Sequence, residues 1–303
     1  WGSNVSDSTF ASVLANNELT ALELQALFDQ AAANHTTASV TGPQGYGVDQ
    51  FLPAGEALPY TINFENPADS TTSPSEIRIV TQLDTSLNPR SFRLGSLRLG
   101  DLSISIPQGR ANFQGDFDFR NSQGFVLRVS AGIDAATATA TWLLQAIDPE
   151  TGEVLRDASR GLLAAGAGGF VSYTVTNAYA AQTGDDVSVS ARVIFDTAAP
   201  FDTPGIVQTL DTGAPTTTLT VQRLGNGGTD YLVEWAASDD TGGSGVKSTS
   251  VYVSEDGAPW QIWQRQTTDT SGVFTGTAGK RYEFIAASTD NAGNREVPNT
   301  PQA

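Results

Sequence analysis

Oxygen-bearing side chains gather in two loops of the C-terminal part of the chain. The first loop contains Asp239 and Asp240, and the second contains Asp290, Asn291 and Asn294. Calcium binds about six to eight oxygen atoms, which come from carboxylates, amide and backbone carbonyls and water. These residue types therefore predict a calcium site, provided that the fold brings the two loops together.

The elements around these loops predict that the fold does so. Runs of alternating apolar and polar residues flank both loops, and such runs are typical of β-strands. In an immunoglobulin-like sandwich the two corresponding loops emerge at the same end, where the first strand also starts. Asp211 lies just before that strand. We therefore expect a calcium ion at a domain junction, with the following ligands: Asp211, Asp239, Asp240, Asp290, Asn291 and Asn294.

The same residues also suit ordinary turns. Asp and Asn side chains bond to their own backbone in turns, and nearby glycines such as Gly242 and Gly293 let the backbone reverse. The spacing differs from that of the helix–loop–helix calcium motif. A pair of turns without a metal ion is therefore the alternative interpretation.

The charge of the chain restricts its partners. The 303 residues include 33 acidic and 16 basic residues, and the formal net charge is −17 at pH 7. Such a charge repels nucleic acids and anionic membranes. No segment reaches the roughly 18 consecutive apolar residues of a membrane span. We expect no nucleic-acid partner and no membrane span in this chain.

The residues needed for common enzyme chemistry are scarce. The chain has no cysteine, which excludes thiol nucleophiles, zinc–thiolate sites and disulfides. A Ser-His-Asp triad would need the single histidine, His35, which lies outside both β-rich regions. Ser244 is flanked by glycines but lacks the strand-to-helix context of a nucleophile elbow. A carboxylate pair for glycoside hydrolysis stays open, because only its spatial separation would identify it. We expect that the protein is not an enzyme.

Residues 1–40 differ from the rest of the chain. Leucines recur there at helical spacing, and Thr20 with Glu23 forms a weak capping box. We expect a helix over residues 21–33 whose apolar stripe packs on the next domain, on another copy of the protein or on an upstream part of a larger protein. The N-terminus lacks the features of a signal peptide and the chain has no Met, so we interpret it as a processed form or a piece of a larger protein.

The rest of the chain predicts two consecutive β-sandwiches. Residues 41–204 hold about nine strand-like runs, including one over residues 187–196, and in another run Tyr60, Ile62 and Phe64 share one face. Residues 205–215 are expected to be a short linker that packs. Residues 216–303 form the second sandwich, with Trp235, Tyr282 and Phe284 in its core. Its strands are predicted at 216–221, 230–237, 246–255, 260–265, 271–275 and 281–290. The predicted fold class is mainly β, with a short N-terminal helical segment.

Both β-rich regions resemble known bacterial domains. Residues 42–211 contain GPQGYG, LPYTINFEN, RIVTQLD, FRLGSLRLGD, GFVSYTV and ARVIFDTAAPFDTP. They resemble a domain family of uncharacterised function from very large bacterial secreted and surface proteins. Residues 214–303 contain the pattern W-x-x-S-D-D and, over residues 282–294, the pattern Y-x-F-x-A-x-S-x-D-N-A-G-N. This combination resembles bacterial fibronectin type III or immunoglobulin-like repeats. The resemblance implies extracellular β-rich modules with no activity attached.

Together these observations predict a structural or adhesive module of an extracellular bacterial surface protein or fibre. The expected partners are other copies or other domains of the same surface protein. The alternative is a carbohydrate-binding accessory module, because Trp260 and Trp263 lie in one hairpin and sugars stack on exposed aromatic rings. These two positions point to opposite faces of a strand, so at least one of them must pack. Lys247 could donate to an internal isopeptide bond, but an exposed charge is the simpler interpretation.

Overall fold

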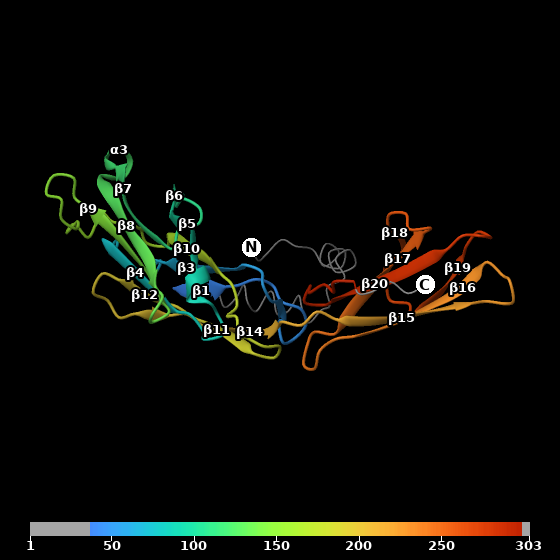
Figure 1. Ribbon diagram of the computed structural model, residues 1–303. Coiled ribbons are helices and arrows are strands. Elements are labelled where there is room, and N and C mark those ends of the chain that lie inside the picture. The colour runs from blue at the N-terminus through green and yellow to red at the C-terminus, as the bar shows by residue number, and fades with distance from the viewer. Residues whose placement is uncertain (1–36, 299–303) are drawn as a thin grey trace, which may run out of the picture.

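Residues 37–298, which the computed structural model describes, form two β-sandwiches that follow each other along an elongated molecule (Figure 1). The buried apolar cluster of the first sandwich lies between Ala38 and Leu210, and that of the second lies between Val233 and Ala286. The two clusters share no residue, so each sandwich has its own core. The prediction of a mainly β fold with two consecutive sandwiches is confirmed. The helix predicted over residues 21–33 lies outside the described residues.

The first sandwich is built from two large antiparallel sheets. One has five strands, in the order β1(Ala38–Thr41), β3(Leu58–Glu65), β10(Gly168–Val175), β5(Arg93–Leu99) and β6(Leu102–Ile104). The other has six, in the order β13(Phe201–Asp202), β12(Arg192–Phe195), β4(Glu76–Gln82), β9(Thr139–Ile147), β8(Phe125–Asp134) and β7(Asn112–Phe119). In β3, the predicted face of Tyr60, Ile62 and Phe64 is buried, and the intervening residues are less so. This alternation is typical of a sheet with one face on the core.

Aromatic rings from both sheets meet in the centre of this core. The ring centroids of Trp142 in β9 and Tyr173 in β10 lie 5.9 Å apart. Phe92 lies 6.0 Å from the ring of Trp142 and 5.2 Å from that of Tyr173. All three side chains are fully buried. Each such ring buries about 150–250 Å², so this cluster holds the two sheets face to face.

A third, smaller sheet corrects the prediction of a linker over residues 205–215. β14(Ile206–Asp211) pairs antiparallel with β11(Asp186–Val189) and parallel with β2(Leu52–Pro53). Leu210 is fully buried in the first core. The segment forms a strand because its backbone groups find partners on both sides. Only residues 212–215 separate β14 from β15(Thr216–Arg223), the first strand of the second sandwich.

The single strand predicted over residues 187–196 is two strands in different sheets. β11 pairs with β14, whereas β12 pairs with β4. Between them, the carbonyl oxygen of Ser190 accepts a hydrogen bond of 2.7 Å from the Thr81 hydroxyl. The backbone N–H of Ala191 donates to Thr203 Oγ1 at 2.9 Å. These side chains satisfy two backbone groups at the point where the chain leaves one sheet and enters the other.

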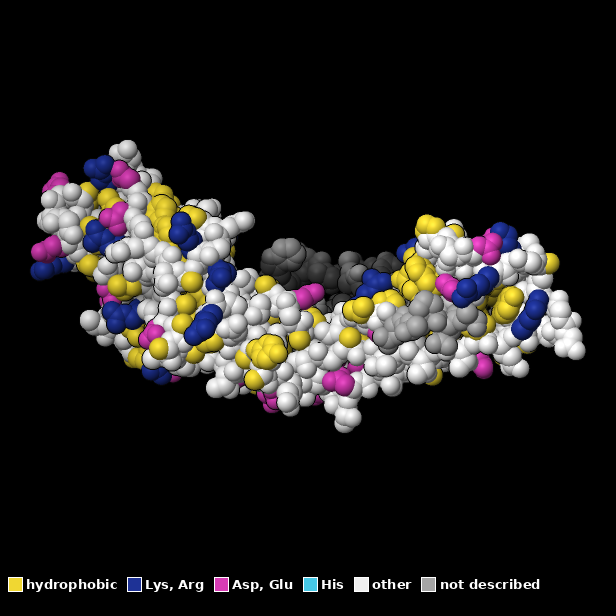
Figure 2. All heavy atoms as spheres, in the orientation of Figure 1, with side chains coloured by type: hydrophobic (Ala, Val, Ile, Leu, Met, Phe, Trp, Pro, Cys, Tyr) yellow, Lys and Arg dark blue, Asp and Glu magenta, His cyan; other side chains and the backbone are white. Residues whose placement is uncertain are grey.

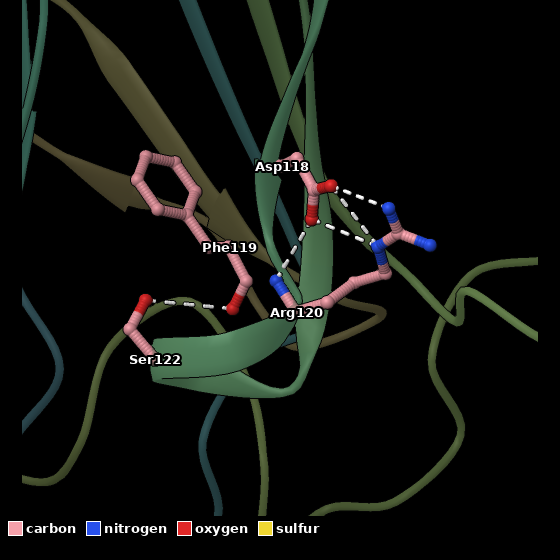
Figure 3. A network of polar contacts seen from close by, with 4 residues as sticks. All are labelled: Asp118, Phe119, Arg120 and Ser122. Atoms are coloured by element: carbon pink, nitrogen blue, oxygen red, sulfur yellow. Dashed lines mark hydrogen bonds and ion pairs between the residues drawn. The ribbon is translucent and has the colours of Figure 1, made fainter.

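Two helical turns lie in the described part of the first sandwich. α3(Arg120–Gln123) follows β7, and the Asp118 carboxylate accepts hydrogen bonds from the backbone and the guanidinium of Arg120 (Figure 3). Gly124 ends the turn at a φ of 77°, a conformation that favours glycine. The Asp118–Arg120 ion pair is exposed and therefore contributes little stability. The other turn is η2(Pro89–Ser91), which the Asn88 side chain caps.

The second sandwich has two three-stranded antiparallel sheets. One contains β15, β16(Asp230–Ser238) and β19(Ser271–Thr275), and the other contains β18(Gln261–Thr267), β17(Val246–Glu255) and β20(Tyr282–Asp290). Every strand begins and ends within about two residues of its prediction, which is within the usual uncertainty of element boundaries. The strongly patterned sequence around the two acidic loops therefore predicted this sandwich well.

The core of the second sandwich contains the predicted aromatic residues. Trp235, Tyr282 and Phe284 are buried. Trp263 packs edge-to-face on Trp235 and Phe284, with centroid distances of 6.1 and 5.9 Å. Trp260 is 39% exposed. Trp263 thus packs against the core, whereas Trp260, which lies just before β18, does not.

The surface view shows two lobes with a narrower waist between them (Figure 2). Acidic side chains are scattered over both lobes on the face shown. Among residues 37–298, none of the helices has the length and apolar character needed to cross a membrane. The waist is where the sequence predicts the calcium site.

Candidate metal centre

Three chain segments meet at the waist between the two sandwiches. β14 of the first sandwich ends at Asp211, the loop between β16 and β17 begins at Asp239, and β20 ends at Asp290. Figure 1 shows β14 and the loop after β20 approaching the waist from opposite lobes. The immunoglobulin-like arrangement of the second sandwich explains this meeting, because both of its loops emerge where its first strand begins.

The carboxylates of Asp211, Asp239 and Asp290 form a compact cluster. One carboxylate oxygen of each residue lies within 4.8 Å of the other two. Asp211 and Asp290 are fully buried, and Asp239 is partly buried. Among the ion pairs of residues 37–298, none includes any of the three. Two like charges about 4 Å apart repel each other by roughly 4 kcal/mol at an effective dielectric constant of about 20.

Backbone N–H groups orient the three carboxylates. Ser244 donates to Asp211 Oδ2 at 2.7 Å, and Gly245 donates to Asp239 Oδ2 at 2.7 Å. Two N–H groups of the last loop, those of residues 293 and 294, donate to Asp290 Oδ1 at 2.6 and 2.8 Å. The positions of the three carboxylates are therefore set by the loops themselves.

The second oxygen of two of these carboxylates has no partner. The Oδ1 atoms of Asp211 and Asp239 are buried, and neither accepts a hydrogen bond within the part of the chain that the structure describes. A buried polar atom left without a partner costs about 1–3 kcal/mol, and more when it is charged. A cation among the three side chains would satisfy both atoms and offset the repulsion between the carboxylates.

The pKa shifts of two aspartates also indicate that the cluster lacks a compensating positive charge. Burial raises the pKa of the Asp239 carboxyl above its usual range, and the nearby Asp211 charge raises it further. Burial likewise raises the pKa of Asp290, although hydrogen bonds from Asn294 and Gly293 act in the opposite direction. The ionised form of both groups is therefore disfavoured unless a positive charge accompanies it.

Asp240 does not join the cluster, although the sequence predicts it as a ligand. Its side chain is exposed. A Cβ atom added to Gly213 would lie 2.4 Å from the Asp240 Cγ, so the absence of a side chain at Gly213 leaves room for this carboxylate. Asp240 therefore lies against the connection between the sandwiches and outside the group of three carboxylates.

The two predicted asparagine ligands act as hydrogen-bond donors. Asn291 Nδ2 donates to the carbonyl oxygens of Ser244 and Gly245, at 3.0 and 2.8 Å. Asn294 Nδ2 donates to the Asp211 carbonyl oxygen at 2.9 Å and to Asp290 Oδ2 at 2.8 Å. These amides bind the loops to each other and to the first sandwich. The structure thus gathers three of the six predicted ligands in one cluster, all of them aspartates.

Sequence reasoning missed two residues that shape this region. Ser244 donates its backbone N–H to Asp211, and its hydroxyl accepts a hydrogen bond of 2.8 Å from the N–H of Ala292. Glu296 is buried and accepts hydrogen bonds from the backbone N–H of Thr217 at 2.8 Å, from the Thr217 hydroxyl, and from the N–H of Ser288 at 3.1 Å. The flanking glycines were a signal for a tight turn at Ser244. No sequence signal marked Glu296 as buried, because glutamate side chains usually lie on the surface.

Within residues 37–298, other reactive residues do not form a second metal centre. Lys247 is exposed at the start of β17. His35 lies outside the described residues. The Ser244 hydroxyl accepts a hydrogen bond from the N–H of Ala292, and its backbone N–H donates to the Asp211 carboxylate. Among the described residues, the three aspartates are the one group of acidic or histidine side chains with the spacing of metal ligands.

Comparisons with known proteins concern the fold alone. No protein-family model matches this chain, and no curated protein matches it. Domains D2 and D3 of the major pilin SpaD from Corynebacterium diphtheriae are 14% identical, with 84% of this chain and 82% of that chain covered and a TM-score of 0.34. The major pilin subunit BcpA of Bacillus cereus is 10% identical, with coverages of 88% and 65% and a TM-score of 0.37. The collagen-binding domain of a Staphylococcus aureus adhesin is 13% identical, with coverages of 58% and 97% and a TM-score of 0.31. The family resemblances noted in the sequence stay predictions.

Proposed function

We propose that this chain is a structural module in which a bound calcium ion fixes the angle between two β-sandwiches. The observation that carries the proposal is the pair of buried, unpartnered Oδ1 atoms of Asp211 and Asp239 beside the carboxylate of Asp290. A divalent cation is the simplest ligand that offsets most of the charge of three clustered carboxylates. Calcium is favoured over softer metals because all of the available ligands are oxygen atoms.

The position of the cluster explains why binding would be structural. Asp211 is the last residue of the first sandwich, whereas Asp239 and Asp290 belong to the second. An ion shared by these side chains joins the two bodies directly. Only residues 212–215 connect the sandwiches otherwise. Because the ion binds the folded junction and not the unfolded chain, it would stabilise the junction by about 2.7 kcal/mol at a concentration 100-fold above its Kd.

An extracellular surface role fits a junction that calcium stiffens. Calcium sites of extracellular modules work at Kd values of about 10⁻⁴–10⁻³ M, which suit the calcium available outside cells. The elongated shape of two sandwiches in series suits a spacer, a fibre subunit or the stalk of an adhesin (Figure 1). We propose this structural or adhesive role at the bacterial cell surface, with other copies or other domains of the same surface protein as its partners.

Calorimetry and scattering test the proposal on the full chain. Isothermal titration should show binding of one calcium ion per chain, and the melting temperature should rise in calcium relative to chelator. In ensemble fits to small-angle scattering data, the maximum dimension of the molecule should vary less with calcium than in chelator, because the ion stiffens the junction. Asp239→Asn should lose all three effects, and the matched control Asp118→Asn, whose carboxylate pairs with Arg120 far from the junction, should keep them. Equal melting temperatures and scattering curves in calcium and in chelator would refute the proposal.

A further inference from the structure

A groove crosses the outer face of the five-stranded sheet of the first sandwich. Its volume is about 680 Å³, and side chains of β1, β3, β10 and β5 line it. Ser39 pairs with Asn63, Asn63 pairs with Phe170, and Phe170 pairs with Arg98, so the four residues form one row across adjacent strands. They alternate with buried residues of the same strands and therefore point away from the core. The groove is separate from the three aspartates of the junction.

One aromatic ring lies in the middle of this row. Phe170 is half-buried and has polar neighbours on both sides, Asn63 and Arg98. The surface beside the ring is open at Gly168, where an added Cβ atom would meet only the carbonyl oxygen of Phe64, at 3.5 Å. The sheet position next to the ring therefore leaves space for a ligand to stack on it. Aromatic side chains supply a large, rigid apolar surface for such stacking.

Hydrogen-bonding groups of both kinds surround the ring. Arg98 carries donors, Asn63 carries donors and an acceptor, and the exposed carboxylates of Glu65 and Asp101 carry acceptors. Arg98 Nε donates to the carbonyl oxygen of Gly100 at 2.7 Å, which positions the guanidinium at the groove. Two carboxylates and one guanidinium leave the groove with little net charge. It therefore complements a neutral molecule that is rich in hydroxyl groups.

A second hollow lengthens the groove. Its volume is about 320 Å³, it shares Gly100, Asp101 and Ala167 with the first, and it reaches Gln123 and Arg160. Because the two hollows share lining residues, a linear ligand of several units could occupy both. Arg160 and Gln123 add further hydrogen-bond donors at the far end.

We propose that this groove binds a neutral oligosaccharide, with one sugar ring stacked on Phe170 and its hydroxyl groups bonded to Asn63, Arg98 and the two carboxylates. An extended polypeptide suits the groove less well. Sheets recognise extended peptides through unpaired backbone groups at a strand edge. The groove lies on the face of the sheet, where β3, β10 and β5 are already paired on both sides.

Binding of three labelled hexasaccharides to the full chain tests this proposal: a β-1,4-glucan, an α-1,4-glucan and a β-1,4-N-acetylglucosamine oligomer. We expect at least one to bind, in calcium and in chelator alike, because the groove is independent of the junction. Phe170→Ala should weaken binding by about tenfold or more, since it removes the stacking surface. Gly168→Gln keeps the phenyl ring but fills the open surface beside it, so it should weaken binding to a similar extent. The matched control Val273→Ala changes an exposed apolar residue of the second sandwich and should bind like the wild type.

Three outcomes would overturn the proposal. The first is that none of the three hexasaccharides binds. The second is that one binds but Phe170→Ala and Gly168→Gln, with circular dichroism spectra like that of the wild type, bind it equally well. The third is that gelatin, used as an extended polypeptide, binds in a Phe170-dependent manner while no hexasaccharide does, which would identify the groove as a polypeptide site.

Discussion

The carbonyl oxygen of Asp211 accepts a hydrogen bond of 2.9 Å from the side chain of Asn294, a residue 83 positions later in the chain. The same carbonyl oxygen accepts the backbone N–H of Ala54 at 3.1 Å. Asp211 is therefore held by the first sandwich and by the last loop of the second at once. Its carboxylate, with the buried and unpartnered Oδ1, lies among the acidic groups of that second sandwich. Hydrogen bonds therefore connect the two sandwiches at the junction, and several properties of this junction can be tested.

Asp211→Asn is expected to abolish the response to calcium. In chelator the variant should be at least as stable as the wild type, because one of three clustered like charges has gone. In calcium it should lack the increase in melting temperature that the wild type shows. Differential scanning calorimetry in both conditions measures this. Asp240→Asn, which neutralises an exposed neighbour outside the cluster, should keep the wild-type response, and loss of the response in this control would mean that Asp240 is a ligand after all.

Asn294→Ala is expected to loosen the junction even without calcium. The variant loses hydrogen bonds to the Asp211 carbonyl oxygen and to Asp290 Oδ2. The loss should cost about 1–3 kcal/mol, because the buried Asp290 Oδ2 is left without a donor, whereas the Asp211 carbonyl oxygen keeps the N–H of Ala54. Urea unfolding in chelator measures this cost, and calcium affinity should fall as well. Asn226→Ala, in the exposed turn between β15 and β16, is the control, and an equal effect of both variants would contradict the assigned role.

Glu296→Gln is expected to destabilise the second sandwich. The carboxylate accepts the N–H groups of Thr217 in β15 and Ser288 in β20, and so connects its two sheets. An amide can accept with only one of its two groups, so about 1–3 kcal/mol should be lost. Faster hydrogen exchange at the Thr217 and Ser288 amides is the direct readout. Glu234→Gln, on the exposed side of β16, should leave exchange at these two amides unchanged.

Alkaline pH is expected to destabilise the first sandwich. Burial raises the pKa of Tyr60 and of Tyr173 above the usual value, with smaller contributions from Asp84 to Tyr60 and from Tyr60 to Tyr173. The folded state therefore binds these protons more tightly than the unfolded state does. Their contribution is complete below the unfolded pKa of about 10 and falls as the pH rises above it. Urea unfolding between about pH 9 and 11 should show this decline.

Tyr60→Phe supplies the control for that decline. The variant loses one titrating phenol, and with it the hydrogen bond of 3.2 Å to Gln208 Oε1, so it should be less stable at neutral pH but lose less stability on going to alkaline pH. Tyr179→Phe removes a fully exposed phenol and should follow the wild-type curve. An unchanged slope in Tyr60→Phe would show that other groups cause the alkaline loss.

Local pattern was enough to predict much of this molecule. Alternation of apolar and polar residues is a property of a few consecutive positions, because successive side chains of a strand point to opposite faces. It therefore identified all six strands of the second sandwich and the buried face of Tyr60, Ile62 and Phe64. The two acidic loops could be predicted to meet Asp211, because the order of strands in a sandwich determines which loops share an end.

Tertiary structure decided what depends on partners far apart in the sequence. β14 is a strand because β11 and β2 lie beside it, although the same residues resemble a linker when read alone. Glu296 is buried because Thr217 and Ser288 supply donors to it. Which three of the six predicted ligand residues form a cluster, namely Asp211, Asp239 and Asp290, depends on which atoms are oriented toward one another. Sequence thus determined the strands and the residue types of the loops, whereas burial and unsatisfied atoms, which arise from contacts between distant segments, were decided only by the fold.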